Sequence, residues 1–377
     1  MSTEERNKAI FRRYVEQVTN RGRLEIADEI FDAYIAHQPD GSVLKRGPED
    51  VKRFQAEFRS ALPDIQASIE DQIAEGDRVM TRWKIRGTLQ SEFRGIAPTG
   101  KELELNGIGI FRFSPEGKVV ESWDSYDQLN LMRQRLEQEM GMARRIQQAL
   151  LPHTIPHLEG WEVTAYYRPA REVGGDFYDF LELPDGRLGL VVGDATGHGM
   201  PASLVMATAR SMLRAVAQGS DSPGIVLRRA NDPLVTDIPP NMFVTCLYAI
   251  LDPESGRLRY ANAGHDLPYW RHRGGGAEEL RARGMPLGLM PGMDYEEKEI
   301  VLGEGESILF YSDGLVEAHD PHHEMFGFSR LRELIATHAS GGPELADFLL
   351  AELEQFTGVE WEQEDDITLV TLQSSPR

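Results

Sequence analysis

The sequence LGLVVGDATGHG, residues 188–199, places an apolar run directly before an aspartate and a glycine-rich turn. The arrangement recurs in SILFYSDG, residues 307–314, and an aspartate pair opens the apolar run DDITLVTL, residues 365–372. A buried strand bounded by aspartate presents a carboxylate at the edge of its sheet. The three segments therefore predict a sheet-rich domain with acidic side chains at a common edge.

Four aspartates in such positions form the candidate site: Asp176, Asp194, Asp313 and Asp365. A single Asp-Gly pair is usually an ordinary turn, but four acids at strand ends favour a shared site. Converging carboxylates create a negative field that a hard divalent cation relieves. We therefore predict a centre for Mn²⁺ or Mg²⁺ and expect two ions.

The charge balance restricts the partners of the chain. Its 377 residues include 40 lysines and arginines against 61 aspartates and glutamates, a net charge of −21. This excess disfavours nucleic acid and anionic membrane as partners, and a phosphorylated substrate would need a bound cation to offset it. The sequence contains neither an apolar run of membrane-spanning length nor a readable secretory signal, so we expect a cytoplasmic protein.

After Pro156 the sequence alternates apolar strands and glycine-rich turns with two pairs of helices. This pattern predicts two sheets between helix layers. The one cysteine, Cys246, lies in an apolar stretch and is expected to be a buried strand thiol. The expected strands are 161–168, 177–183, 187–193, 243–251, 257–262, 306–311 and 367–372, and the expected helices are 201–217, 222–236, 328–339 and 343–356.

The amino-terminal part, residues 1–127, has a different pattern. Apolar helical faces run through residues 3–20 and 24–31. From Val79 onward, apolar and charged residues alternate with the period of a half-buried strand. Further strands are expected at 102–113 and 118–126. Helices followed by a curved antiparallel sheet describe an α+β domain.

Residues 128–152 are expected to form a linker helix between this domain and residues 153–377. From Leu129 to Leu150 the a and d positions of three heptads are apolar except at Glu139, and Pro152 ends the pattern. Two interpretations remain open. The helix packs on its own chain, or it pairs with a second copy as a coiled coil, in which case the protein is a homodimer.

Six motifs lie within residues 143–372. They are Ala143 with Ile146-Gln147 and Leu150-Leu151-Pro152, then Gly174-Gly175-Asp176-Phe177-Tyr178-Asp179, Gly193-Asp194-Ala195-Thr196-Gly197-His198-Gly199, Asn262-Ala263-Gly264-His265, Ser312-Asp313-Gly314-Leu315 and Asp365-Asp366-Ile367-Thr368. As a set they resemble the SpoIIE/RsbU-type branch of the metal-dependent serine/threonine protein phosphatases. The resemblance implies the protein phosphatase 2C-type α/β-β/α sandwich for residues 153–377.

The resemblance also implies roles for the site residues. Asp176 and Asp194 would share the metal ions, with the Ala195 carbonyl as a further ligand. Asp313 and Asp365 would complete the set of catalytic and metal-binding residues. Asp366 competes with Asp365, because only one of two neighbours points inward along a strand, and we favour Asp365. The two histidines in glycine turns, His198 and His265, are expected to have structural roles.

The implied reaction is hydrolysis of phosphoserine or phosphothreonine on a small regulatory protein, by a water activated between the cations. The implied partner is a phosphorylated STAS-type anti-sigma-factor antagonist. Arg168 and Arg171 precede the first aspartate, but nothing in the sequence directs either at a phosphate. Two other functions remain open: a catalytically silent module that binds such a partner, and a bifunctional protein with isomerase-like or cyclase chemistry in its first domain.

Residues 34–41, 111–113 and 119–124 of the first domain resemble the SnoaL-like, ketosteroid-isomerase-like cone fold. The resemblance implies a pocket for a small apolar ligand. The pocket candidates are His37, Trp83, Trp123 and Asp124, although strand alternation places Trp123 and Asp124 on opposite faces. Joined to a phosphatase by a helix, this domain is expected to act as a sensor or dimerisation domain.

Overall fold

The computed structural model describes residues 1–338, 340–358 and 361–375, and the side chains of residues 128–131, 134 and 185 lie outside this description. The backbone divides into two compact units, residues 1–139 and 140–377. In the described part of the chain, no helix combines the length and the apolar character needed to cross a membrane.

The first unit is a six-stranded sheet with helices packed on one face. The helical elements are α1 (Thr3–Arg13), the π-helical η1 (Tyr14–Asn20), the 3₁₀ turn η2 (Leu24–Ile26), α2 (Ala27–Ile30) and α3 (Pro48–Ala61). The strands are β1 (Phe31–His37), β2 (Val43–Arg46), β3 (Gln66–Glu75), β4 (Arg78–Thr88), β5 (Glu102–Phe113) and β6 (Val119–Tyr126). Their order in the sheet is β2-β1-β6-β5-β4-β3.

The core of this unit lies between the helices and the sheet, where Phe11 and Val51 meet Phe111. The strands predicted from Val79, at 102–113 and at 118–126 are confirmed within one residue of their starts. Two expectations were wrong in detail. The sheet is not wholly antiparallel, because β1 runs parallel to β6. The first helix does not stay α-helical to residue 20, because its last seven residues are π-helical.

Helix α4 (Gln128–Leu150) begins in the first unit and ends in the second. Of its heptad residues, the Leu129 side chain lies outside the described part of the structure. Met132, Leu136 and Ile146 are 62%, 56% and 60% exposed. These three side chains are exposed in the described part of the chain, and both interpretations of the helix stay predictions.

In its described residues, the second unit contains two five-stranded sheets and, after the end of α4, four helices. The strands are β7 (Trp161–Arg168), β8 (Phe177–Glu182), β9 (Leu188–Ala195), β10 (Val244–Asp252), β11 (Arg257–Ala263), β12 (Tyr269–Arg271), β13 (Ala277–Glu279), β14 (Glu297–Val301), β15 (Ser307–Tyr311) and β16 (Ile367–Ser374). The helices are α5 (Gly199–Ala217), α6 (Pro223–Asp237), α7 (Phe328–Thr337) and α8 (Gly342–Thr357), with 3₁₀ turns η3 (Pro184–Gly186) and η4 (Asp313–Leu315). The sheet orders are β14-β11-β10-β9-β8 and β13-β12-β15-β16-β7.

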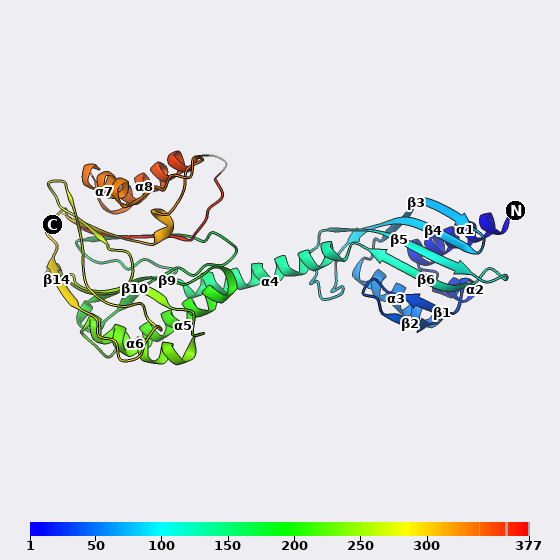
Figure 1. The fold of residues 1–377 in the computed structure, drawn as a ribbon, viewed down its shortest axis with the longest axis horizontal. Helices are drawn as coiled ribbons and strands as arrows, with labels where there is room; N and C mark the ends of the chain where they lie inside the picture. The colour runs from blue at the N-terminus through cyan, green and yellow to red at the C-terminus, as the bar shows by residue number, and fades with distance from the viewer. Residues whose placement is uncertain (339, 359–360, 376–377) are drawn as a thin grey trace. The chain divides into compact units, whose positions relative to one another are not determined.

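Strand alternation builds the layers of this unit. In β9, Leu190 and Val192 belong to the core between the two sheets, whereas Val191 packs on the layer of α5 and α6. Leu309 and Leu369 of the second sheet pack on α7 and α8 in the same way. Figure 1 shows α5 and α6 together on one side of this unit and α7 and α8 on the other. The predicted arrangement of two sheets between helix layers is confirmed.

The predicted strands and helices of this unit lie within two residues of the observed ones, apart from residue 339, which lies outside the described residues. Three strands were missed: β12, β13 and β14. Each has only three to five residues, and β13 and β14 are edge strands. Short edge strands carry little apolar alternation, so the sequence gives no period from which to detect them.

Candidate metal centre

The four predicted aspartates all lie beside strand ends. Asp176 directly precedes β8 and Asp194 is the penultimate residue of β9, and these two strands are neighbours in one sheet. Asp313 stands two residues after β15 and Asp365 two residues before β16, which are neighbours in the other sheet. The acids therefore come from one adjacent strand pair in each sheet.

The four carboxyl groups lie close enough to affect one another. Removal from water raises the pKa of Asp194 to about 8, and the charges of Asp313 and Asp365 add to the effect. The pKa of Asp313 rises to about 7, through burial and then the charge of Asp365. Burial and the charge of Asp194 raise the pKa of Asp176 well above its ordinary value. Like charges held together in this way disfavour one another's ionisation.

Two glycines let the loop before Asp176 lie close to Asp194 and Asp366. A Cβ atom on Gly175 would stand 2.5 Å from the Ala195 carbonyl oxygen and 3.1 Å from Asp194 Oδ1. A Cβ atom on Gly174 would stand 2.0 Å from an Asp366 carboxylate oxygen. Only glycine permits such close approach of backbone to backbone and carboxylate, which explains the Gly-Gly-Asp sequence.

Asp366 and Asp365 have different surroundings. Asp366 is 5% exposed, and its carboxylate accepts N–H groups from Ala170 at 2.8 Å, Gly175 at 2.6 Å and Asp176 at 3.2 Å. These three bonds use Asp366 to anchor the loop that carries Asp176. Asp365 Oδ1 accepts the N–H of Asp366 at 2.8 Å. Its charge adds to burial in raising the pKa of Asp313.

Further contacts hold Asp176 and its strand in place. The Thr368 hydroxyl donates to Asp176 Oδ2 at 2.6 Å. The buried Asp179, three residues after Asp176, forms ion pairs with Arg210 at 2.9 Å and Arg214 at 2.6 Å. Both arginines lie on α5. Helix α5 begins immediately after the glycine turn that follows Asp194. The ion pairs therefore connect the segments that carry the first two aspartates.

The donor set fits a hard divalent cation. Carboxylate and carbonyl oxygens are the ligands that Mg²⁺ and Mn²⁺ prefer, and a cation would relieve the repulsion that raises these pKa values. Within the described residues, no group of three or more His, Cys, Asp or Glu side chains converges tightly enough to hold an ion by itself. Mg²⁺ is often bound through one or two carboxylates and keeps several waters, so a site for it does not require three converging side chains.

The two histidines differ in environment. His265 is 8% exposed, its Nδ1 lies 2.9 Å from Thr245 Oγ1, and removal from water lowers its pKa to about 4. Asn262 braces the same turn by exchanging two hydrogen bonds with the His265 backbone. These contacts agree with a structural role. His198 is exposed at the start of α5. Burial raises the pKa of Asp365, and the nearby His198 offsets a small part of that rise.

Neither the cysteine nor the nearby arginines supply an alternative reaction centre. Cys246 is fully buried in β10, and burial raises the pKa of its thiol, so the prediction of a structural thiol is confirmed. The Arg168 guanidinium lies 5.6 Å from the centre of the Trp361 ring, and Arg171 is exposed. The structure thus gives Arg168 a stacking partner on the protein itself.

Helix α4 contacts the loop of the metal centre directly. Gln147 is 5% exposed, and its amide donates to the Gly174 carbonyl at 2.7 Å while accepting the Gly174 N–H at 3.1 Å. We call this pair of bonds the Gln147 clamp. Sequence reasoning included Gln147 in a motif but gave it no role, since a buried side-chain amide carries no signal until the loop it binds is known.

The first unit contains a separate cavity. Of the four predicted pocket residues, Trp83 and Asp124 line it. His37 and Trp123 do not, and that part of the prediction was wrong: they stack on each other at 4.8 Å, and His37 pairs with Glu121 at 2.9 Å. The expected separation of Trp123 and Asp124 onto opposite faces is confirmed. Sequence reasoning missed Tyr14, Gln55 and Arg94, which line the cavity from segments not expected to meet.

Two sheets packed face to face between helix pairs, with acids at their strand ends, define a protein phosphatase 2C-type domain. A family model described as stage II sporulation protein E (SpoIIE) matches residues 184–375, just over half of the chain. The chain therefore belongs to the SpoIIE family. A second model, described as SnoaL-like polyketide cyclase, matches residues 9–135, so the first unit is SnoaL-like.

Two similar proteins and a solved structure support the assignment to the SpoIIE family. Protein IcfG of Synechocystis is 33% identical over 266 residues, which cover 63% of this chain and 41% of that protein. Phosphoserine phosphatase RsbU of Bacillus subtilis is 26% identical over 67% of this chain and 74% of its own length. Among solved structures, the SiaA-PP2C domain of Pseudomonas aeruginosa matches with a TM-score of 0.56 at 26% identity, covering 64% of this chain and 98% of that domain.

Proposed function

We propose that this chain is a metal-dependent protein serine/threonine phosphatase. The observation that carries the proposal is the group of four aspartates at the strand ends of two facing sheets. Their pKa values are raised by burial and by the charges of neighbouring carboxylates. A cluster of this kind is costly to fold without a cation, which argues against the alternative of a catalytically silent module.

Asp176, Asp194, Asp313 and Asp365, with the Ala195 carbonyl, are the proposed ligands of Mn²⁺ or Mg²⁺, and two ions are proposed. Asp365 is preferred over Asp366 because the carboxylate of Asp366 already accepts three backbone N–H groups. Bound divalent cations would supply Lewis acidity and lower the pKa of water. The chain's own residues hold the carboxylates in place. The Thr368 hydroxyl donates to Asp176, and Gly175 lets the loop before Asp176 approach the Ala195 carbonyl.

The proposed substrate is a phosphoserine or phosphothreonine on a small regulatory protein, of the STAS-type anti-sigma-factor antagonist class. The name of the relative RsbU, a phosphoserine phosphatase, supports this choice. An acidic chain with a net charge of −21 accepts an anionic group only where local positive charge offsets the field. Cations at the aspartates would provide that charge.

We also propose that the first unit regulates the phosphatase through α4 and that the chain is a homodimer. The domain limits proposed are 1–127, 128–152 and 153–377. The Gln147 clamp supports regulation, because a shift of α4 would pull on the loop that carries Asp176. The exposed Met132, Leu136 and Ile146 support a helix pair with a second copy, since heptad residues bury against a partner.

The test is phosphate release from a phosphoserine peptide with Mn²⁺, with Mg²⁺ and with a chelator. We expect release with at least one ion and none with the chelator. Asp194→Ala should remove the metal-dependent activity, and the exposed Asp347 offers the matched control Asp347→Ala. Release that survives both the chelator and Asp194→Ala would overturn the proposal. A silent module would release no phosphate under any condition while still binding a phosphorylated partner.

A further inference from the structure

Strand β7 carries a tyrosine whose side chain projects toward the metal centre. Tyr167 is the cross-strand partner of Thr368 on β16, and residues directly opposite each other on neighbouring strands project from the same face of the sheet. The Thr368 hydroxyl donates to Asp176 Oδ2 at 2.6 Å. Tyr167 therefore stands next to the side chain that holds the first proposed metal ligand.

The space beside Gly174 gives the position of the Tyr167 hydroxyl. A Cβ atom on Gly174 would stand 2.0 Å from Asp366 Oδ2 and 2.5 Å from the Tyr167 hydroxyl oxygen. Because both distances are measured from one point, the two oxygens lie close together, beside the loop that carries Asp176. Any side chain at position 174 would collide with both. The glycine thus leaves open the space into which the hydroxyl projects.

The hydroxyl of Tyr167 is sealed from solvent and has no hydrogen-bond partner among the described residues. The Asp366 carboxylate beside it already accepts three backbone N–H groups, two of them on Oδ2. The Gly174 carbonyl accepts from Gln147 instead. A phenolic hydroxyl can donate and accept, and leaving it unpaired in the interior lowers stability. Phenylalanine would fill the same space without that cost, so packing alone does not account for a tyrosine here.

The surroundings of this hydroxyl are acidic. Burial raises the pKa of Tyr167, and the charge of Asp366 raises it further. Asp176 and Asp194, two of the proposed metal ligands, add to the rise, and Arg144 partly offsets it. The hydroxyl is therefore protonated at neutral pH and lies in the field of carboxylates that would hold a cation.

Two other tyrosines of this unit, Tyr248 and Tyr295, have buried hydroxyls without a partner in the described residues. Burial raises the pKa of both, and the charges that act on them come from residues other than the four aspartates. An unpaired hydroxyl alone is therefore no sign of a function. Tyr167 differs because its unpaired hydroxyl lies beside the loop that carries Asp176.

We propose that Tyr167 is a further residue of the metal centre and that its hydroxyl hydrogen-bonds to a water in the hydration shell of the bound cation. This role rests on the proposed function, because it requires that cation. Mg²⁺ keeps several waters when a protein binds it, and a cation polarises their O–H groups so that they seek acceptors. The Tyr167 hydroxyl oxygen is an acceptor beside a carboxylate, that of Asp366, whose Oδ2 is already engaged twice. Tyr167 would thus position water at the metal centre.

The direct test is calorimetric binding of Mn²⁺ to the full-length parent and to Tyr167→Phe. Loss of one hydrogen bond to the hydration shell should weaken Mn²⁺ binding by about three- to tenfold. In chelator, the urea midpoint of Tyr167→Phe should equal or exceed that of the parent, because the variant lacks an unpaired buried hydroxyl. Tyr248→Phe is the matched control: it also removes an unpaired buried hydroxyl and should bind Mn²⁺ as the parent does.

A second measurement reports on the water itself. Water proton relaxation measures how long waters stay on bound Mn²⁺, and it needs no enzymatic activity. We expect waters to leave faster in Tyr167→Phe than in the parent, and at the parent's rate in Tyr248→Phe. In phosphate release, Tyr167→Phe should lower kcat with little change in KM, since the hydroxyl is assigned to water and not to the phosphoprotein.

The outcomes separate the role of Tyr167 from the proposed function. Mn²⁺ affinity and water exchange equal to those of the parent in Tyr167→Phe would overturn the role and leave the proposed metal centre intact. A lower urea midpoint in chelator would also overturn it, since the hydroxyl would then have a partner in the metal-free chain. No Mn²⁺ binding by the parent would overturn both. Weaker Mn²⁺ binding in Tyr167→Phe alone, in a chain that releases no phosphate, would support the role and count against the proposed function.

Discussion

The two units hold acidic side chains in opposite ways. In the first, Asp124 stands among aromatic rings, and burial raises its pKa to about 6 while Ser122 and Arg46 pull it down. In the second, acids face acids, and the charges of Asp313 and Asp365 add to burial in raising the pKa of Asp194 to about 8. Burial is the leading cause at both sites, but only the second adds like-charge repulsion.

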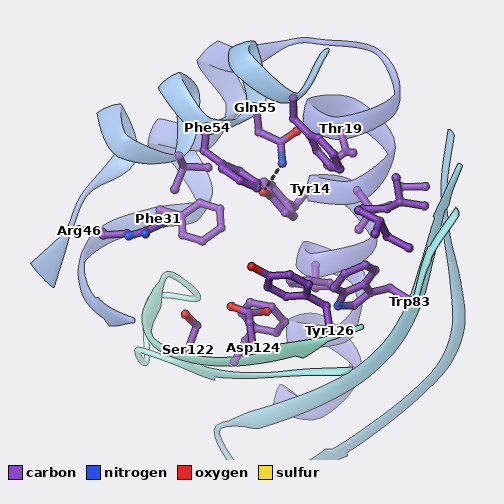
Figure 2. Close-up of a pocket in the computed structure, with 18 of the residues that line it drawn as sticks. Tyr14, Thr19, Phe31, Arg46, Phe54, Gln55, Trp83, Ser122, Asp124 and Tyr126 are labelled. Carbon is purple, nitrogen blue, oxygen red and sulfur yellow. Dashed lines mark hydrogen bonds between the residues drawn. The ribbon is translucent and has the colours of Figure 1, made fainter. Parts of the chain in front are cut away.

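This difference bears on what each site could hold. A single carboxyl group among rings can remain protonated and donate a hydrogen bond. Several carboxyl groups at one place need positive charge before they can all ionise. The same residue type therefore lines an aromatic cavity in one unit (Figure 2) and forms the proposed cation site in the other.

The largest effect is expected from removing one acid of the cluster. Asp313→Asn keeps the shape of the side chain but removes a proposed ligand, so we expect phosphate release to fall by at least about 1,000-fold, roughly 4 kcal/mol in the activation barrier. The measurement is kcat/KM with saturating Mn²⁺. Asp124→Asn in the first unit should retain the parent rate within about threefold under the same conditions. Equal losses of kcat/KM in Asp313→Asn and Asp124→Asn would show that the two acids do not differ in their effect on phosphate release.

The next effect separates the neighbours Asp366 and Asp365. Asp366→Ala leaves the N–H groups of Ala170, Gly175 and Asp176 without their acceptor, so we expect a loss of about 2–4 kcal/mol in the free energy of unfolding. Asp365→Ala removes a like charge and should cost less than about 1 kcal/mol without metal, while weakening Mn²⁺ binding. Urea unfolding in chelator measures the first quantity and calorimetry the second. If Asp366→Ala weakened Mn²⁺ binding and Asp365→Ala instead lowered the free energy of unfolding, Asp366 would be the ligand.

A third effect is the pH dependence of stability. The pKa of Asp194 is about 8 in the folded chain and about 4 when unfolded. Between these values the unfolded carboxyl group ionises while the folded one stays protonated, so the metal-free chain loses stability as pH rises from about 4 to about 8. Mn²⁺ binds the ionised form and should stabilise more at pH 8 than at pH 6. Asp194→Asn should flatten this window in thermal unfolding, and an unchanged slope would contradict the assignment.

The smallest effect is expected at the Gln147 clamp. Gln147→Leu removes two hydrogen bonds to Gly174, so the loop before Asp176 should become less ordered and Mn²⁺ affinity should fall about tenfold, or roughly 1.4 kcal/mol. The exposed neighbour Gln148 provides the control Gln148→Leu. Mn²⁺ affinity equal to that of the parent in both variants would show that α4 does not support the metal centre.

Much of this architecture could be predicted from the sequence because the acids stand at the ends of strongly apolar strands, as in residues 188–194. Contacts between distant segments could not be predicted, because no local pattern encodes them. The three bonds that anchor Asp366 come from residues about 190 positions earlier in the chain. The π-helical turn that brings Tyr14 and Thr19 to the cavity has no apolar period distinguishing it from the α-helix before it.

If the four aspartates hold divalent cations, an anomalous difference map of crystals grown with Mn²⁺ will locate the ions. We expect peaks within about 2.0–2.4 Å of carboxylate oxygens of Asp194 and Asp313, and we expect these peaks to disappear in the Asp194→Asn variant. Well-ordered crystals with saturating Mn²⁺ and no peak beside these aspartates, or with peaks only at surface carboxylates such as Glu364, would contradict the proposed cation site.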